Sequence, residues 1–206
     1  MRRPGAVADY PGEVILAVDT SLGTAVAVIA ADGSVVAEAS SPDPLGHAEI
    51  IGDLLQRVAR PGVSHVVAGM GPGPFTGLRI GIAAARAFAL GRGIPVVPVP
   101  SHFGAALAAI DGGRRDFAIV TDARRREFAV SRFGGLDVDG IPAPAAETVL
   151  MPQDAEIADA IPTAVIDAVA LARVGARALA AGRVLAGAEP LYLRHPDVRV
   201  PAQVRR

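Results

Sequence analysis

The chain carries a glycine- and proline-rich stretch, GPGPFTGLRIG over residues 71–81, whose composition raises the question of phosphate binding. A glycine loop binds phosphate when several backbone N–H groups point at the anion, usually where a helix begins. Pro72 and Pro74 each remove one such donor. The spacing of Gly71 and Gly73 also matches neither a P-loop nor a dinucleotide fingerprint. A phosphate loop is therefore the less favoured interpretation.

The same stretch fits a structural role better. Thr76 is a residue type that caps helix N-termini, and a helix is predicted from about Gly77 onward. Gly77 and Gly81 have no side chains, so another backbone segment can approach them closely. We therefore interpret the stretch as a rigid turn that directs a strand into a helix.

Asp19 is a second candidate for chemistry, because it ends an apolar run and is followed by Thr20 and Ser21. Actin-like proteins place the aspartate of their first phosphate loop at such a strand end, and Asp122 would be its counterpart in the second half. Neither aspartate is followed by the glycine-rich turn that wraps phosphates. Asp19 is thus a candidate for a vestigial nucleotide site, and no catalytic residue is predicted.

The sequence predicts no metal centre. It contains no cysteine, and its histidines (His47, His65, His102 and His195) are scattered. His47 opens a predicted helix, but Ile51 stands one turn later, so no histidine pair at i and i+4 exists to hold a metal. The simplest interpretation of His47 is a helix-end or surface residue. No nucleophile elbow signals a Ser-His-Asp set either.

Charge and hydrophobicity narrow the classes of function. All twenty basic residues are arginine and the formal net charge is -1, which excludes a Walker lysine and argues against nucleic-acid binding over the whole surface. Two basic groups stay open as solvated surface or nucleic-acid contacts: Arg124–Arg126, and the tail with Arg194, Arg199, Arg205 and Arg206. No stretch approaches the ~20 apolar residues of a membrane span, and no signal peptide precedes the first strand. We expect a cytoplasmic protein with no membrane contact.

The first half alternates strands and helices. Apolar runs at 13–21, 24–30 and 34–40 are joined by turns too short for crossover helices, so they are predicted to be antiparallel. An amphipathic helix over 47–59, a strand over 63–69, a helix over 77–92, a strand over 94–100 and a weaker helix over 101–110 follow.

The helix over 77–92 is apolar nearly all round. Leu78, Ile82, Ala85 and Ala89 mark one face, and apolar residues occupy others as well. This pattern implies burial on more than one side. One side should lie on the sheet, and the other is covered either by the chain's own core or by a partner subunit.

The second half begins like the first, with strands predicted over 117–123 and 127–135, a proline-rich connector, a helix over 167–181 and an edge strand near 188–196. We interpret this as a weak internal duplication. The predicted fold class is α/β, of the ribonuclease H-like, actin-like ATPase type, with an N-terminal lobe over 1–110 and a reduced C-terminal lobe over 111–206.

Several of these stretches occur together in a known family. VDTS, a helix opened by His47, AGMGPGPFTGLRIG, TDARRREFAV and EPLYLR, in this order, resemble the TsaB (YeaZ) family of bacterial tRNA threonylcarbamoyladenosine (t6A) biosynthesis. The similarity extends from about residue 13 to 194, and its most specific element is the stretch at 71–81.

The resemblance implies a non-catalytic actin-like subunit of the t6A37 modification complex. It implies pairing with a larger TsaD-type transferase paralogue through a helical bundle, docking of a TsaE-type P-loop ATPase, tRNA contact through the complex, and a possible homodimer in isolation. It implies no cofactor on this chain, whereas the complex uses ATP and threonylcarbamoyl-adenylate, with a metal in the partner. The implied interface residues are His47, Ile50, Leu54, Leu78, Ile82, Ala85, Arg86 and Ala89, beside the motif loop Gly71, Pro72, Gly73, Phe75, Thr76, Gly77 and Arg79.

Two alternatives from another class stay open. One is a degenerate actin-like nucleotide hydrolase or kinase that uses Asp19. The other is an M22 peptidase-like protein, for which this sequence lacks the metal ligands because Ile51 stands where the second histidine would be.

Overall fold

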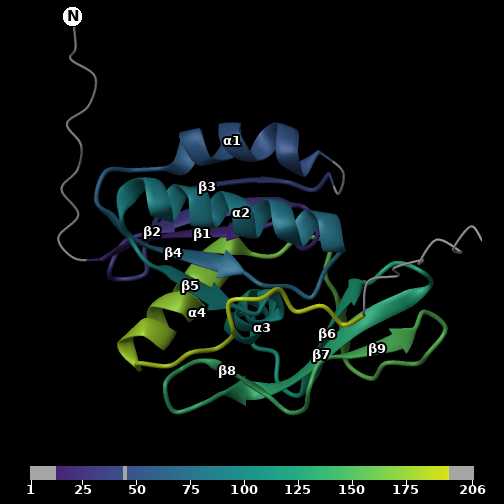
Figure 1. The fold of residues 1–206 in the computed structure, drawn as a ribbon. Helices are drawn as coiled ribbons and strands as arrows, with labels where there is room; N and C mark the ends of the chain where they lie inside the picture. Colours follow the sequence, from purple (N-terminus) through teal and green to yellow (C-terminus); the bar gives the residue numbers. More distant parts are fainter. Residues whose placement is uncertain (1–12, 44–45, 195–206) are drawn as a thin grey trace, which may run out of the picture.

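A computed structural model describes residues 13–43 and 46–194 of the chain. The expectations for the first twelve residues, for His195 and for Arg199, Arg205 and Arg206 fall outside these residues. The described residues form two five-stranded sheets and four α-helices (Figure 1).

The first sheet has the strand order β3-β2-β1-β4-β5. The first three strands form an antiparallel meander, and the last two run parallel to β1, as helical crossovers require. The strands are β1 (Val14–Asp19), β2 (Thr24–Ile29), β3 (Val35–Ser41), β4 (Val63–Gly69) and β5 (Val96–Val99). This confirms the predicted order of elements in the first half.

Helices cover both faces of this sheet (Figure 1). Helices α1 (His47–Val58) and α2 (Phe75–Arg92) share one face, α4 (Ala168–Ala180) contacts the other, and α3 (Ser101–Asp111) lies beside α4. Alternate residues of β1 therefore enter different cores: Leu16 and Val18 join α1 and α2, whereas Ile15 and Ala17 join α3 and α4.

The second sheet has the order β10-β6-β7-β8, with β9 also paired to β7. Its strands are β6 (Phe117–Asp122), β7 (Glu127–Leu136), β8 (Pro142–Pro144), β9 (Val149–Pro152) and β10 (Ala160–Pro162). The β6–β7 hairpin repeats the β1–β2 arrangement, with an aspartate at the end of each first strand. The predicted proline-rich connector between this hairpin and the last helix contains three short strands. Their prolines lie at strand ends, where a missing N–H costs little.

Helix α4 follows the second sheet in the chain but returns to the first. It contacts β1 and β2 and lies beside α3. Phe117, Phe133 and Ile119 of the second sheet bury their side chains in the same hydrophobic core. One core therefore joins the first sheet with its helices to the second sheet, and we call these two parts the first lobe and the second lobe.

Two further expectations need correction. Helix α2 begins at Phe75 with Pro74 as N-cap residue, so Thr76 lies inside the first turn and makes no cap. The expected edge strand near the end is absent from the described part, residues 188–194, which instead cross the surface without regular structure. Pro190 interrupts any ladder there.

Candidate functional site

The motif loop approaches the turn between β1 and β2 so closely that side chains cannot fit. A Cβ atom at Gly73 would lie 2.4 Å from the carbonyl oxygen of Ser21, and one at Gly77 would lie 2.7 Å from that of Thr20. At Gly81 a Cβ would lie 2.1 Å from Thr20 Oγ1. The close backbone approach predicted for these glycines is confirmed at Gly77, whereas at Gly81 it is the Thr20 side chain that comes close. Both contacts explain why these positions are glycine.

Hydrogen bonds fix the loop on both sides. Thr20 Oγ1 donates to the Gly77 carbonyl (2.6 Å) and accepts from the Gly81 N–H (3.0 Å). Gly71 donates its N–H to Ser101 Oγ (2.9 Å) and accepts the Ser101 N–H (2.7 Å). The loop therefore holds the start of α2 in one position against the sheet.

Helix α2 has one buried face and one outward face. Leu78, Ile82, Ala85 and Ala89 belong to the core on the sheet, and Ala85 is 0 % exposed. The face that the family resemblance assigns to the partner interface is thus buried in the core of this chain. The ambiguity arose because the helix is apolar on both sides. Its outward residues are Phe75, Thr76, Arg79, Ala83, Arg86, Ala87, Leu90, Gly91 and Arg92.

Helix α1 shows the same division. His47 is buried, and its Nδ1 lies 2.9 Å from Thr24 Oγ1, so it ties the helix start to β2 instead of facing solvent. Leu54 is buried in the same core and Ile50 is half-buried. Ala48, Glu49, Gly52, Asp53 and Gln56 face outward. Together with the outward residues of α2 they form what we call the outer helix surface.

The motif also meets the C-terminal stretch that accompanies it in the family resemblance. The rings of Phe75 and Tyr192 stack with centroids 4.7 Å apart, and Arg79 Nε donates to Tyr192 Oη (2.9 Å). The Arg79 guanidinium also lies 3.6 Å from the centre of the Phe75 ring. Phe75 and Arg79 therefore hold the stretch around Tyr192 on α2, a role that no local sequence pattern indicates.

Asp19 lies at the end of β1 and is 1 % exposed. Its Oδ1 accepts hydrogen bonds from the backbone N–H (2.8 Å) and hydroxyl (2.5 Å) of Ser21, whereas Oδ2 accepts no well-aligned bond from a described residue. Burial raises the pKa of Asp19, and hydrogen bonding from Ser101 and Ser21 opposes this only in part. Asp19 lines neither of the two pockets described next.

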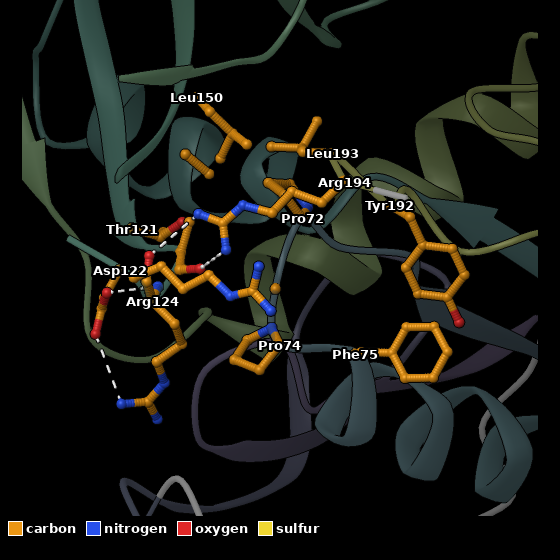
Figure 2. Close-up of a pocket in the computed structure, with 14 residues that line it drawn as sticks. Pro72, Pro74, Phe75, Thr121, Asp122, Arg124, Leu150, Tyr192, Leu193 and Arg194 are labelled. Carbon is orange, nitrogen blue, oxygen red and sulfur yellow. Dashed lines mark hydrogen bonds and ion pairs between the residues drawn. The ribbon is translucent and has the colours of Figure 1, made fainter. Parts of the chain in front are cut away.

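Two pockets lie between the lobes. One, of about 360 Å³, has walls from the motif loop, the β6–β7 turn and the C-terminal stretch, including Pro72, Pro74, Arg124, Leu150 and Arg194 (Figure 2). The other, of about 560 Å³, is mostly apolar and also contains Pro74 and Arg124. Arg124–Arg126 all have positive φ (63°, 56° and 61°), which turns this basic segment sharply at the pocket edge.

A polar network is centred on His102. The sequence did not predict it, because His102 has no other histidine near it in the chain. His102 Nδ1 lies 2.6 Å from Ser131 Oγ and Nε2 lies 3.0 Å from Thr121 Oγ1, with Thr148 beyond Ser131 at 2.7 Å. Burial lowers the pKa of His102 to about 3, so the ring is neutral at neutral pH. The network joins α3 to the second sheet.

Among the described residues, no group of three or more His, Asp or Glu side chains is placed to hold a metal ion. No helix in this part of the chain is long and apolar enough to cross a bilayer.

The chain matches a family profile and is similar to several mycobacterial proteins. Residues 47–173, more than half of the chain, match the profile of TsaD, described as tRNA N6-adenosine threonylcarbamoyltransferase. An uncharacterized protein of Mycobacterium tuberculosis is 35 % identical over 90 % of this chain and 93 % of its own length, and one of Mycobacterium bovis matches equally. Another, from Mycobacterium leprae, is 37 % identical over 58 % of this chain and 35 % of its own length.

Solved structures share the fold. YeaZ from Pseudomonas aeruginosa has a TM-score of 0.69 at 23 % identity, covering 88 % of this chain and 100 % of its own. A second structure, described as an uncharacterized protein with similarity to peptidase YEAZ from the same organism, reaches 0.72 at 24 % identity with the same coverage. The actin-like α/β fold is confirmed, and profile and fold together confirm the resemblance to TsaB (YeaZ).

Proposed function

The chain belongs to the TsaD family of tRNA N6-adenosine threonylcarbamoyltransferases, and we propose that it is a non-catalytic, TsaB-type subunit that binds a transferase paralogue. A role related to t6A follows from the family and the YeaZ fold. The subunit role is the proposal, and the outer helix surface carries it.

The outer helix surface has the properties of a helix-packing interface. Leu90 is 85 % exposed and lies on the same side of α2 as several small residues. Gly52 of α1 and Gly91 of α2 have no neighbouring atom within 4 Å of where a Cβ would lie. Ala83 and Ala87 continue the row of small side chains. Partner helices could therefore approach these two helices closely.

Charges around this surface would orient a partner. Outward charges of both signs lie around this surface, with Glu49, Asp53 and Arg57 on α1 and Arg86 and Arg92 on α2. A partner with complementary charges would gain association rate and register from them. Arg86 and Ile50, both expected at the interface, are at least partly accessible here.

The buried residues support a subunit without its own chemistry. His47 is engaged by Thr24, and Ile51, at the position of a second metal-binding histidine, is 8 % exposed in the core. Asp19 is enclosed. ATP, threonylcarbamoyl-adenylate and the metal ion are accordingly assigned to the other subunits, with the TsaE-type ATPase docking on the pair and tRNA bound by the complex.

Charge substitutions separate the two faces of α2. Ala87→Glu places a carboxylate on the outer helix surface, and it is expected to leave folding intact and weaken binding to the host's transferase paralogue at least about 100-fold, since stranding a charge in an interface costs ~3 to 5 kcal/mol. The matched control is Ala180→Glu, an exposed alanine of α4 on the opposite side of the sheet. Isothermal titration measures both affinities.

Each outcome bears on the proposal. Normal binding by Ala87→Glu would refute the outer helix surface as the interface, and equal loss by Ala180→Glu would show an unspecific effect of charge. Ala85→Glu is expected to unfold the chain by itself, because Ala85 lies in the core. An isolated chain that self-associates should also become monomeric with Ala87→Glu.

A further inference from the structure

The last described segment, residues 188–194, crosses from one lobe to the other, and we call it the strap. On the first lobe, Leu191 donates its N–H to the carbonyl of Met70 (2.8 Å) and Arg86 donates to the carbonyl of Ala188. Tyr192 adds the contacts to Phe75 and Arg79 described above. Leu191 and Tyr192 also pack against the core beneath α1 and α2. The start of the strap thus belongs to the first lobe.

The end of the strap is held by the second lobe. Arg194 donates through Nη1 to the Ala123 carbonyl (3.2 Å) and through Nη2 to the Arg124 carbonyl (3.2 Å). It also forms an ion pair with Glu127. The two carbonyls belong to the β6–β7 turn, and Glu127 is the first residue of β7. The Arg194 side chain therefore binds both the turn and the start of the second strand of this hairpin.

The strap forms one wall of the smaller pocket. Tyr192, Leu193 and Arg194 line it opposite the β6–β7 turn, and Leu150 of β9 lies near Leu193 (Figure 2). The motif loop supplies the remaining wall. The β6–β7 turn and the motif loop, which form other walls of the pocket, are therefore both in contact with the strap.

We propose that the strap is a latch, which holds the two lobes together across this pocket and closes one side of it. Its two attachments lie on different lobes, so releasing either one frees the segment to move away from the pocket. The hydrogen bonds of Arg194 are made to carbonyl groups of a half-exposed turn, and such attachments open far more readily than the shared core. The pocket then opens without unfolding of either lobe.

Thiol labelling tests the latch directly, because the chain has no cysteine of its own. Leu150→Cys places one thiol in the pocket wall, and Val138→Cys places one at a fully exposed reference position. Each is reacted with an uncharged maleimide in the full-length chain. The background variants are Arg194→Ala, which removes the attachment to the second lobe, and Tyr192→Ala, which removes the side-chain contacts with Phe75 and Arg79 but leaves the Leu191–Met70 hydrogen bond. Arg60→Ala is the matched control, since it removes an arginine that donates to two carbonyls on the first lobe, those of Arg57 and Ala59.

Either release is expected to raise the labelling rate at position 150 about tenfold, because several hydrogen bonds that keep the pocket closed are lost. The rate at position 138 should not change, which controls for general unfolding. Arg60→Ala should leave both rates within about twofold. An unchanged rate at position 150 in Arg194→Ala would overturn the proposal, because this variant removes the attachment to the second lobe that a latch requires.

Discussion

Gly81→Ala is the substitution that most sharply tests how the motif loop positions α2. The new methyl group would lie 2.1 Å from Thr20 Oγ1 and 3.0 Å from Thr20 Cβ, well inside contact distance. The Thr20 side chain is held in place, because its hydroxyl donates to the Gly77 carbonyl and accepts from the Gly81 N–H. It cannot rotate away without breaking those bonds.

The cost follows from three contributions. Overpacking costs ~1 to 3 kcal/mol, loss of two buried hydrogen bonds costs ~0.5 to 1.5 kcal/mol each, and alanine returns up to about 1 kcal/mol of helix propensity. The free energy of unfolding should therefore fall by roughly 3 kcal/mol. For a chain of this size the melting temperature should fall by ~6 to 12 °C.

Urea unfolding of Gly81→Ala and of Gly91→Ala measures this effect against a control in the same helix. Gly91 has nothing within 4 Å, so alanine there should stabilise the chain by about 0.5 to 1 kcal/mol. The two variants are thus expected to differ in sign. If Gly81→Ala were neutral or stabilising, the loop would not be locked on Thr20 as described.

Two buried groups predict opposite dependences of stability on pH. Burial lowers the pKa of His102 to about 3 in the folded chain, against 6.5 in the unfolded chain, so the neutral ring stabilises the fold fully above pH 6.5. About 1.4 kcal/mol of stability per pH unit is lost as the pH falls from 6.5 toward 3. His102→Gln should reduce this dependence on pH, as measured by urea unfolding at several pH values. Burial raises the pKa of Asp19, so stability should fall as pH rises above 3.8, and Asp19→Asn, which keeps Oδ1, should raise the free energy of unfolding at pH 7. A variant less stable than the natural chain at pH 7 would show that Asp19 is stabilised as an anion.

Most of the first lobe could be predicted because each element carries its own pattern. β1, β2 and β4 are continuous apolar runs, and α1 has apolar residues at helical spacing. Asp167, expected at the start of the last helix, caps α4 by accepting the Ala170 N–H (2.8 Å). Local chemistry was sufficient in these cases.

The orientation of α2 could not be predicted, because residues on both of its sides are apolar or small. Only the distance to Thr20 shows which glycines are required, and only burial shows that Ala85 is core. The position of the strap against α2 could not be predicted for a different reason. Tyr192 and Arg79 are 113 residues apart, and nothing in either segment indicates the other.

The most direct measurement of the central claim is light scattering during size-exclusion chromatography of this chain mixed with the transferase paralogue of its host. The account predicts a stable 1:1 complex whose mass is the sum of the two chains, formed without added nucleotide. Separate elution of the two chains at micromolar concentration, with or without ATP and the P-loop ATPase, would contradict the proposed subunit role.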